Sequence, residues 1–223
     1  MLLKVEFFFN FNTSTRKGAV MSGKYSRQNL LSSEFLSFLF TVTSLTAGGK
    51  SSLIEGLKTE FAHRNIEMNF ISVGAIMRNY ARVWGFPSIE DFSGYNRAHP
   101  EDGYDKKCDN KVREIGEKNH RVIEGRLPHI FVPKGFHILL HCPLDIRARR
   151  RHERQNYDNL SFDETKRLIE QRDSDDNSRY EVLYPGCIWA DSDFDSIVNS
   201  STMTVDEEVQ AIFRDWERWI LKK

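Results

Sequence analysis

The stretch TVTSLTAGGKSSL, residues 41–53, comes close to a phosphate-binding loop. That motif reads G-x-x-x-x-G-K-[ST], and the letters G-K-S at 49–51 fill its last three positions. Ser44 stands where the motif has its first glycine. The run FLFTVT (38–43) before the loop predicts a buried strand, and apolar residues at helical spacing follow the loop. A strand, a glycine-rich turn and a helix in this order are the context that such a motif requires.

This loop carries the groups that hold the phosphates of a nucleotide. Gly48 and Gly49 let the backbone pass close to an anion. The N–H groups at the start of a helix and the helix dipole both favour an anion bound at that position. Lys50 has the reach for the β- and γ-phosphates, and the Ser51 hydroxyl suits Mg²⁺. If the Ser44 position needs a left-handed backbone, a side chain there costs ~1–2 kcal/mol and weakens binding or folding about tenfold. The alternative is a Gly-Gly-Lys-Ser turn that arose by chance.

Further apolar runs extend this start into a sheet. Strands are expected at 68–73, 120–125, 136–142 and 195–201, and helices at 50–64, 74–85, 143–155, 162–183 and 205–223. Short strands that alternate with helices predict an α/β fold with a parallel sheet covered on both faces. Ligands of such sheets bind beyond the carboxyl ends of the strands.

Composition narrows the class of protein. The chain has 223 residues with 32 basic and 32 acidic side chains, so no overall field attracts nucleic acid or an anionic membrane. Its three cysteines lack the C-x-x-C spacing of a zinc site and fit a reducing compartment. No apolar run reaches the ~20 residues of a membrane helix. We expect a soluble, cytoplasmic monomer.

The first 36 residues differ from the remainder. MLLKVEFFFNFN is rich in phenylalanine, and the part after it is basic, serine-rich and poor in acids. We expect residues 1–36 to be a dispensable extension and residues 37–223 to form one domain. A targeting presequence for an organelle, an added edge strand and a start at Met21 are the alternatives.

Two sets of arginines are sorted onto helical faces. The first set lies at i, i+3, i+4 and i+7 and comprises Arg147, Arg150, Arg151 and Arg154. The second comprises Arg172 and Arg179 with Asp176 between them. Arginine suits phosphate oxygens and stabilises the charge of a phosphoryl group in transfer. A solvated basic face and a surface ion-pair ladder are the alternatives.

Polar residues also follow the predicted strands. In RVIEGR (121–126), Glu124 is placed to hold Mg²⁺ through water or to orient an acceptor, and Arg126 to clamp a second phosphate. In ISVGAIMR (71–78), Ser72 and Arg78 lie at the end of the neighbouring strand. For each of these residues taken singly, a purely structural role is the alternative to binding a substrate or metal.

Together these motifs resemble the short, archaeal-type cytidylate kinases of the P-loop nucleoside monophosphate kinase superfamily. The pieces, from about Leu39 onward and in the family's order, are SLTAGGKSS, ISVGAIMR, VIEGR, PLDIRARRRHER, RDSDDNSRYEVLYPG and DSIVNSSTMTVDEEV. The resemblance implies a three-layer α/β/α P-loop kinase fold with a five-stranded parallel sheet. It also implies a monophosphate-binding region at about 74–118 and a lid at about 147–160. Ser44 and the extension depart from the family pattern.

The resemblance further implies phosphoryl transfer from ATP with Mg²⁺ to CMP or dCMP. ATP would contact Thr46, Ala47, Gly48, Gly49, Lys50, Ser51 and Ser52, and the metal Ser51 and Glu124. The phosphate of the acceptor would contact Ser72, Arg78 and Arg126. The transferring group would be surrounded by Lys50, Arg147, Arg151, Arg172 and Arg179, with Asp176 orienting the arginines. Asp105 or Asp109 would accept a hydrogen bond from the cytosine amino group.

Three other functions remain open at this point. One is a kinase for another small acceptor, such as AMP, UMP or a non-nucleotide alcohol. Another is an ATP-binding module with little or no transfer activity. A nucleic-acid-binding protein is disfavoured by the balanced charge and by the absence of clustered aromatic residues near the arginines.

Overall fold

The computed structural model describes residues 38–154, 160–186 and 189–222. The expected extension at 1–36, the end of the expected lid at 155–159 and Cys187 lie outside the described residues. Cys108 and Cys142 are free and buried. Within the described ranges, no helix combines the length and the apolar character that crossing a bilayer requires.

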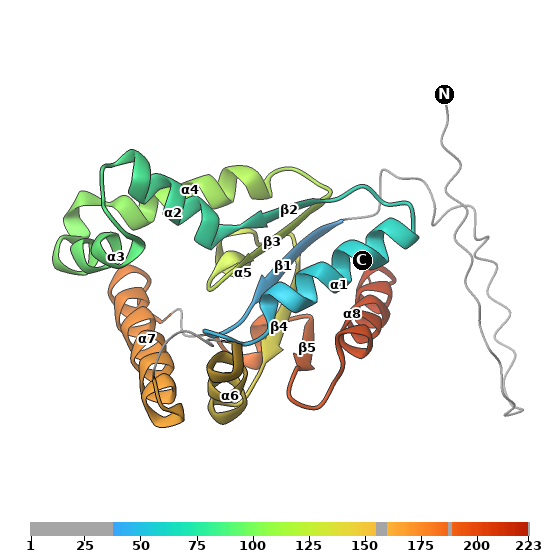
Figure 1. Ribbon diagram of the computed structural model, residues 1–223. Coiled ribbons are helices and arrows are strands. Elements are labelled where there is room, and N and C mark those ends of the chain that lie inside the picture. Colours follow the sequence, from blue (N-terminus) through green and yellow to red (C-terminus); the bar gives the residue numbers. More distant parts are fainter. Residues whose placement is uncertain (1–37, 155–159, 187–188, 223) are drawn as a thin grey trace, which may run out of the picture.

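A parallel sheet forms the centre of the molecule (Figure 1). Its strands are β1 (Leu39–Thr43), β2 (Asn69–Ser72), β3 (Arg121–Gly125), β4 (Phe136–His141) and β5 (Ser196–Asn199), in the order β2-β3-β1-β4-β5. The register pairs Thr43 with Gly125 and Ser72 with Glu124. The ends of β1, β2 and β3 therefore lie side by side, and the loops that follow them meet at one edge.

Helices connect and cover the strands. They are α1 (Lys50–His63), α2 (Val73–Val83), α3 (Ile89–Ala98), α4 (Tyr104–Gly116), α5 (Pro128–Phe131), α6 (Leu144–Arg154), α7 (Phe162–Leu183) and α8 (Val205–Ile220). The strands and the helices α1, α2, α6, α7 and α8 confirm the predicted order. The short helix α5 was not predicted from periodicity, nor was α3, whose first turn Ser88 caps by accepting from the Asp91 N–H.

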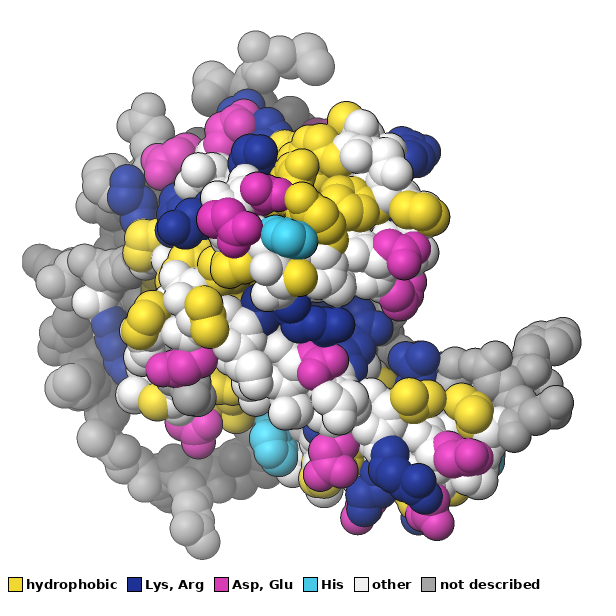
Figure 2. Space-filling view, turned by 90° about the vertical axis from the view of Figure 1, so that its left-hand side faces the viewer, with side chains coloured by type: hydrophobic (Ala, Val, Ile, Leu, Met, Phe, Trp, Pro, Cys, Tyr) yellow, Lys and Arg dark blue, Asp and Glu magenta, His cyan; other side chains and the backbone are white. Residues whose placement is uncertain are grey.

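The helices form two layers around the sheet, which completes a three-layer α/β/α P-loop kinase fold. Helices α1 and α8 pack on one face, and α4 and α5 pack on the other. Helices α2, α3 and α4 project beyond the sheet towards α7 (Figure 1). Seen from that side, lysine and arginine side chains gather in the middle of the face (Figure 2).

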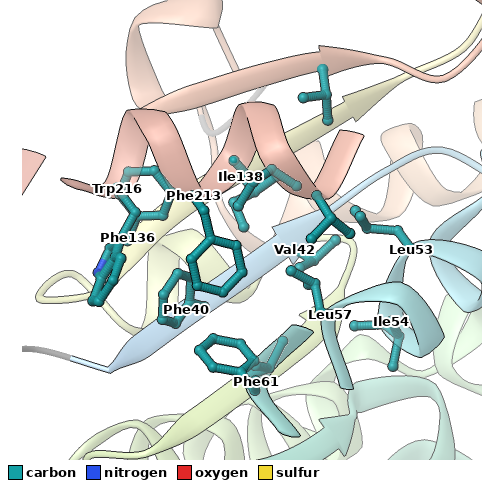
Figure 3. Close-up of a cluster of buried hydrophobic side chains, with 14 of the residues drawn as sticks. Phe40, Val42, Leu53, Ile54, Leu57, Phe61, Phe136, Ile138, Phe213 and Trp216 are labelled. Carbon is teal, nitrogen blue, oxygen red and sulfur yellow. The ribbon is translucent and has the colours of Figure 1, made fainter. Parts of the chain in front are cut away.

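The larger core cluster lies between the sheet and the layer formed by α1 and α8 (Figure 3). Phe40 of β1 makes edge contacts with Phe61 of α1 and Phe136 of β4, at centroid distances of 5.3 and 5.6 Å. Burying such rings removes apolar area from water at about 25 cal/mol per Å². This packing holds β1 and α1 at the two ends of the predicted phosphate loop.

Candidate active site

The loop between β1 and α1 has the backbone of an anion cradle. Gly49 caps α1 at its N-terminus with φ 102°, and Ala47 has φ 59°. Ser44 is not among the described residues with positive φ, so the strain expected there is absent. The sequence predicts a cost for a side chain at 44 only if that position needs a left-handed backbone. In the structure the left-handed positions of the loop are 47 and 49 instead. In the first turn of α1, the Ser52 N–H donates to the Gly49 carbonyl at 3.0 Å, which leaves the N–H groups of Lys50 and Ser51 for a ligand.

Ser44 instead fills space beside Gly48. Its side chain is fully buried, and its hydroxyl donates to the Leu45 carbonyl at 3.3 Å. A Cβ atom on Gly48 would lie 2.0 Å from the Ser44 Oγ. The serine hydroxyl and the missing side chain at 48 are therefore complementary within this loop.

Lys50 lies at the start of α1 with its amine turned back along the loop. Its Nζ donates to the Ser44 carbonyl at 3.2 Å. The pKa of Lys50 is lowered to about 8, mainly by burial and also by the nearby charges of Arg126 and Arg172, against the opposing effect of Glu124. A buried ammonium surrounded by arginines is stabilised by any anion that enters.

Two cavities open beside this lysine. The first, of about 590 Å³, is lined by the loop residues 47–52, by arginines of α6 and by the segment between β5 and α8. The second, of about 640 Å³, is lined by the ends of β2 and β3 and by α2, α3 and α7. Both are lined by Ala47, Lys50, Ser51, Glu124 and Arg151. A group held at this shared wall is reachable from both cavities.

Arg126 lines the second cavity and carries a donor without a hydrogen-bond partner among the described residues. Its Nη2 donates to Thr46 Oγ1 at 2.5 Å and pairs with Asp173 at 2.6 Å and Asp176 at 2.9 Å. Its other terminal nitrogen, Nη1, is buried and makes no hydrogen bond within the described structure. A buried N–H group without a partner is costly, so this geometry suits a bound anion.

Asp173 is a functional candidate that the sequence reasoning missed. Its carboxylate accepts from the Thr46 N–H at 3.1 Å and pairs with Arg147 at 2.6 Å as well as with Arg126. Burial alone would raise its pKa, but the two guanidinium groups hold the pKa of Asp173 below its usual value. Its spacing in the sequence could have indicated this position. Asp173 follows the buried Thr165 and Ile169 at intervals of four residues and therefore lies on the same face of the helix.

The first arginine set does not act as one face. Arg147 is buried and donates to the carbonyls of Cys142 and Thr46, so it braces the loop from behind. Arg150 is bound by Ser200, whose hydroxyl also donates to the Gly48 carbonyl. Arg151 lines both cavities, and Arg154 lines the first.

The second set surrounds the second cavity. Arg172 and Arg179 both line it, together with Ser72 and Arg78. Asp176 lies between Arg126 and Arg179, at 2.9 and 3.3 Å from their nitrogens. Leu168 of α7 is 53% exposed and contributes to the wall of this cavity.

Asp109 is not part of either cavity wall, contrary to the role expected for it. It lies in α4 and accepts a hydrogen bond from the hydroxyl of Tyr184, the residue directly after α7. Burial raises the pKa of Asp109 to about 6, although that hydrogen bond favours the carboxylate. Asp105 lies 3.9 Å from Arg179. Neither Asp105 nor Asp109 is among the residues that line the two cavities.

Comparison with known proteins decides the family. The model of the cytidylate kinase-like family matches residues 26–202. The chain belongs to the cytidylate kinase-like family. The cytidylate kinase of Methanobrevibacter smithii is 31% identical over 159 residues, which is 71% of this chain and 89% of the relative. That of Methanosphaera stadtmanae is 28% identical over 175 residues, which is 78% of this chain and 95% of the relative.

The fold of this chain is similar to that of a solved structure. An uncharacterized protein from Eubacterium ventriosum superposes with a TM-score of 0.54 at 16% identity. The alignment covers 80% of this chain and 97% of that one. At this identity the likeness concerns the fold alone.

Proposed function

We propose that the protein is a nucleoside monophosphate kinase that transfers the γ-phosphoryl group of ATP to CMP or dCMP. The observation that carries the proposal is the wall shared by the two cavities. Phosphoryl transfer requires donor and acceptor in line at one charged point, with little covalent chemistry from the protein. Lys50 and Arg151 stand at that point.

The cavity beside the loop takes the donor. Residues 46–52 would surround the phosphates, with the N–H groups of Gly49, Lys50 and Ser51 as donors, and Lys50 would neutralise charge that develops in transfer. The Ser51 hydroxyl and the Glu124 carboxylate line both cavities and are oxygen ligands of the kind that Mg²⁺ prefers. Bound there, the metal would neutralise charge on the β- and γ-phosphates.

The other cavity takes the acceptor, which we propose to be a monophosphate. The orphaned Nη1 of Arg126 supplies a buried donor for its phosphate, and Ser72 and Arg78 line the same space. An uncharged alcohol would leave this guanidinium nitrogen without a partner. Arg172 and Arg179 approach from α7, and Asp176 orients Arg179 and Arg126. The names of the archaeal relatives favour cytidine as the nucleoside.

The proposal is tested by release of ADP from ATP in the presence of CMP, dCMP, UMP and AMP in turn. We expect turnover with CMP or dCMP to exceed that with AMP. Lys50→Ala should lower turnover about 10²–10³-fold, as the loss of one electrostatic contact to the transition state does. Lys58→Ala is the matched control, because Lys58 lies on the same helix and is 44% exposed. Absence of any CMP-dependent ADP release, with ATP still bound, would sink the proposal.

A further inference from the structure

The donor cavity has a wall that the phosphate loop does not supply. It is formed by the segment after β5 and by the first turn of α8, with Met203, Thr204, Val205 and Glu208 lining it. A nucleotide whose phosphates occupy residues 47–52 must place its nucleoside along the remaining wall. This segment therefore meets the base or the ribose of the donor.

Glu208 is the charged member of this wall. Its residue is 4% exposed, yet its carboxylate takes part in no hydrogen bond or ion pair among the described residues. Arg150 acts on it only electrostatically, and the guanidinium of Arg150 is bound to Ser200. A buried carboxylate that lines a cavity and lacks a donor is costly unless a ligand supplies the donor.

Capping of α8 does not explain Glu208. The capping box of this helix is formed by Thr204 and Glu207, whose side chain accepts from the Thr204 N–H at 2.8 Å. Asp206 adds a further negative charge in the same turn and is exposed. Asp206 and Glu207 thus already provide the favourable interaction with the helix dipole, and the buried Glu208 is not needed for it.

The chemistry of the wall suits a purine with an amino group. Met203 and Val205 offer apolar surface to a flat ring, and the arginines of α6 offer guanidinium planes that stack on such rings. An ionised carboxylate only accepts hydrogen bonds. It matches the N6 amino group of adenine and opposes the O6 oxygen of guanine or hypoxanthine.

We propose that Glu208 sets the base preference of the phosphoryl donor by accepting a hydrogen bond from the adenine N6 amino group. The inference rests on the proposed function only in that a nucleotide donor occupies this cavity. It makes Glu208 a specificity-determining residue rather than a catalytic one, because the carboxylate meets the base and not the reacting phosphates.

Calorimetric titration of the full chain with ADP and with inosine diphosphate tests this. The two ligands differ at position 6 of the purine, where one carries an amino group and the other an oxygen. A hydrogen bond to a charged group predicts about 10- to 100-fold tighter binding of ADP by the unchanged protein. In Glu208→Gln the preference should fall at least about tenfold, because the amide both donates and accepts.

Two further variants separate selectivity from charge and stability. Asp206→Asn removes a negative charge from the same helical turn and should leave the ADP preference unchanged. Glu208→Asp retains the charge but withdraws it by one methylene, so the preference should fall while the melting temperature is retained. Equal affinity of the unchanged protein for both ligands, or a preference unaltered in Glu208→Gln, would overturn the inference.

The titration distinguishes this inference from the proposed function. It uses diphosphates alone and requires neither an acceptor nor turnover. If CMP-dependent ADP release is absent but the ADP preference depends on Glu208, only the proposed reaction fails. If CMP is phosphorylated equally well by ATP and by inosine triphosphate, only the role of Glu208 fails.

Discussion

At the scale of single residues, the loop departs from its motif without strain. Ser44 replaces a glycine at a position that does not have positive φ, and its hydroxyl occupies the space that a side chain at 48 would need. The free-energy cost expected for Ser44 assumed a left-handed backbone at that position, but Ala47 and Gly49 adopt that conformation instead. Glycine at 48 therefore leaves room for the Ser44 hydroxyl in its present position.

A pair of substitutions tests this complementarity. Gly48→Ala should weaken ADP binding at least about tenfold, because its Cβ would lie 2.0 Å from the Ser44 Oγ. Adding Ser44→Gly should recover part of the loss but not all, since the Leu45 carbonyl also lies 3.1 Å away. Ser44→Gly alone should alter affinity by less than about threefold, by virtue of the unstrained backbone. Calorimetric titration with ADP gives the three values, and purely additive effects would contradict the coupling.

Lys50 gives a prediction of pH dependence. Burial sets its pKa at about 8 in the free protein, and bound phosphates raise it by favouring the charged form. Affinity for ATP should accordingly be full below pH 8 and fall as pH rises, by about tenfold at pH 9. Titrations between pH 7 and 9.5 measure this decline. Lys50→Arg stays charged throughout and should flatten the profile, whereas a parallel decline in that variant would attribute it to other groups.

At the scale of elements, α7 is joined to the phosphate loop through one carboxylate. Asp173 binds the Thr46 N–H and bridges Arg126 of the β3 end and Arg147 of α6. Four separate segments thus meet at one buried group. A change in the position of α7 is transmitted to the loop and to the arginine that we assign to the acceptor.

Asp173→Asn and Asp109→Asn form a matched test of these elements. Removing the charge of Asp173 leaves two buried guanidinium groups under-compensated, which costs about 3–5 kcal/mol. We expect a lower melting temperature and strongly reduced turnover. Asp109→Asn removes a carboxylate whose pKa burial has raised to about 6, so stability at pH 7.5 should be equal or higher.

The acceptor kinetics of the two variants complete the comparison. The KM for CMP should change less than about twofold in Asp109→Asn, since the side chain lines neither cavity. A rise of more than tenfold at unaltered stability would return Asp109 to the acceptor site. Equal melting temperatures for Asp173→Asn and the unchanged protein would remove the proposed bracing role.

At the scale of the whole molecule, the two cavities share one wall, formed by Ala47, Lys50, Ser51, Glu124 and Arg151. They meet over the carboxyl ends of β1 and β3, with α6 and the segment before α8 around one and α2, α3 and α7 around the other. A molecule with adenosine at one end, cytidine at the other and five phosphates between them should span both. We expect it to bind at least 10²-fold more tightly than ADP or CMP alone, because linkage makes the second contact intramolecular.

Calorimetry and thermal unfolding measure this bisubstrate effect. The expected stabilisation grows with the logarithm of ligand concentration over the dissociation constant. Lys50→Ala should weaken the linked ligand more than CMP alone, since Lys50 lies at the wall shared by the cavities. A linked ligand that binds no better than ADP would show that the cavities are not filled together.

The sequence by itself determined the strands, the helices α1, α2, α6, α7 and α8, and the predicted phosphate loop, but it missed α3 and α5. Buried strands read as unbroken apolar runs and surface helices as apolar residues at helical spacing, and both signals are local in the chain. The apolar residues at helical spacing after the loop are all buried, namely Leu53, Ile54, Leu57 and Phe61. The phosphate loop could be recognised from the sequence because its motif residues are adjacent in the chain.

Only the tertiary structure decided which charges line the two cavities. Arginines of one helical face separate into a buried brace, Arg147, and a cavity residue, Arg151, because α7 covers one side of α6 and leaves the other open. Asp173 and Glu208 acquire their positions from contacts between segments far apart in the chain. Burial and pairing of a charge depend on what packs against it, and no local pattern of residues records that neighbour.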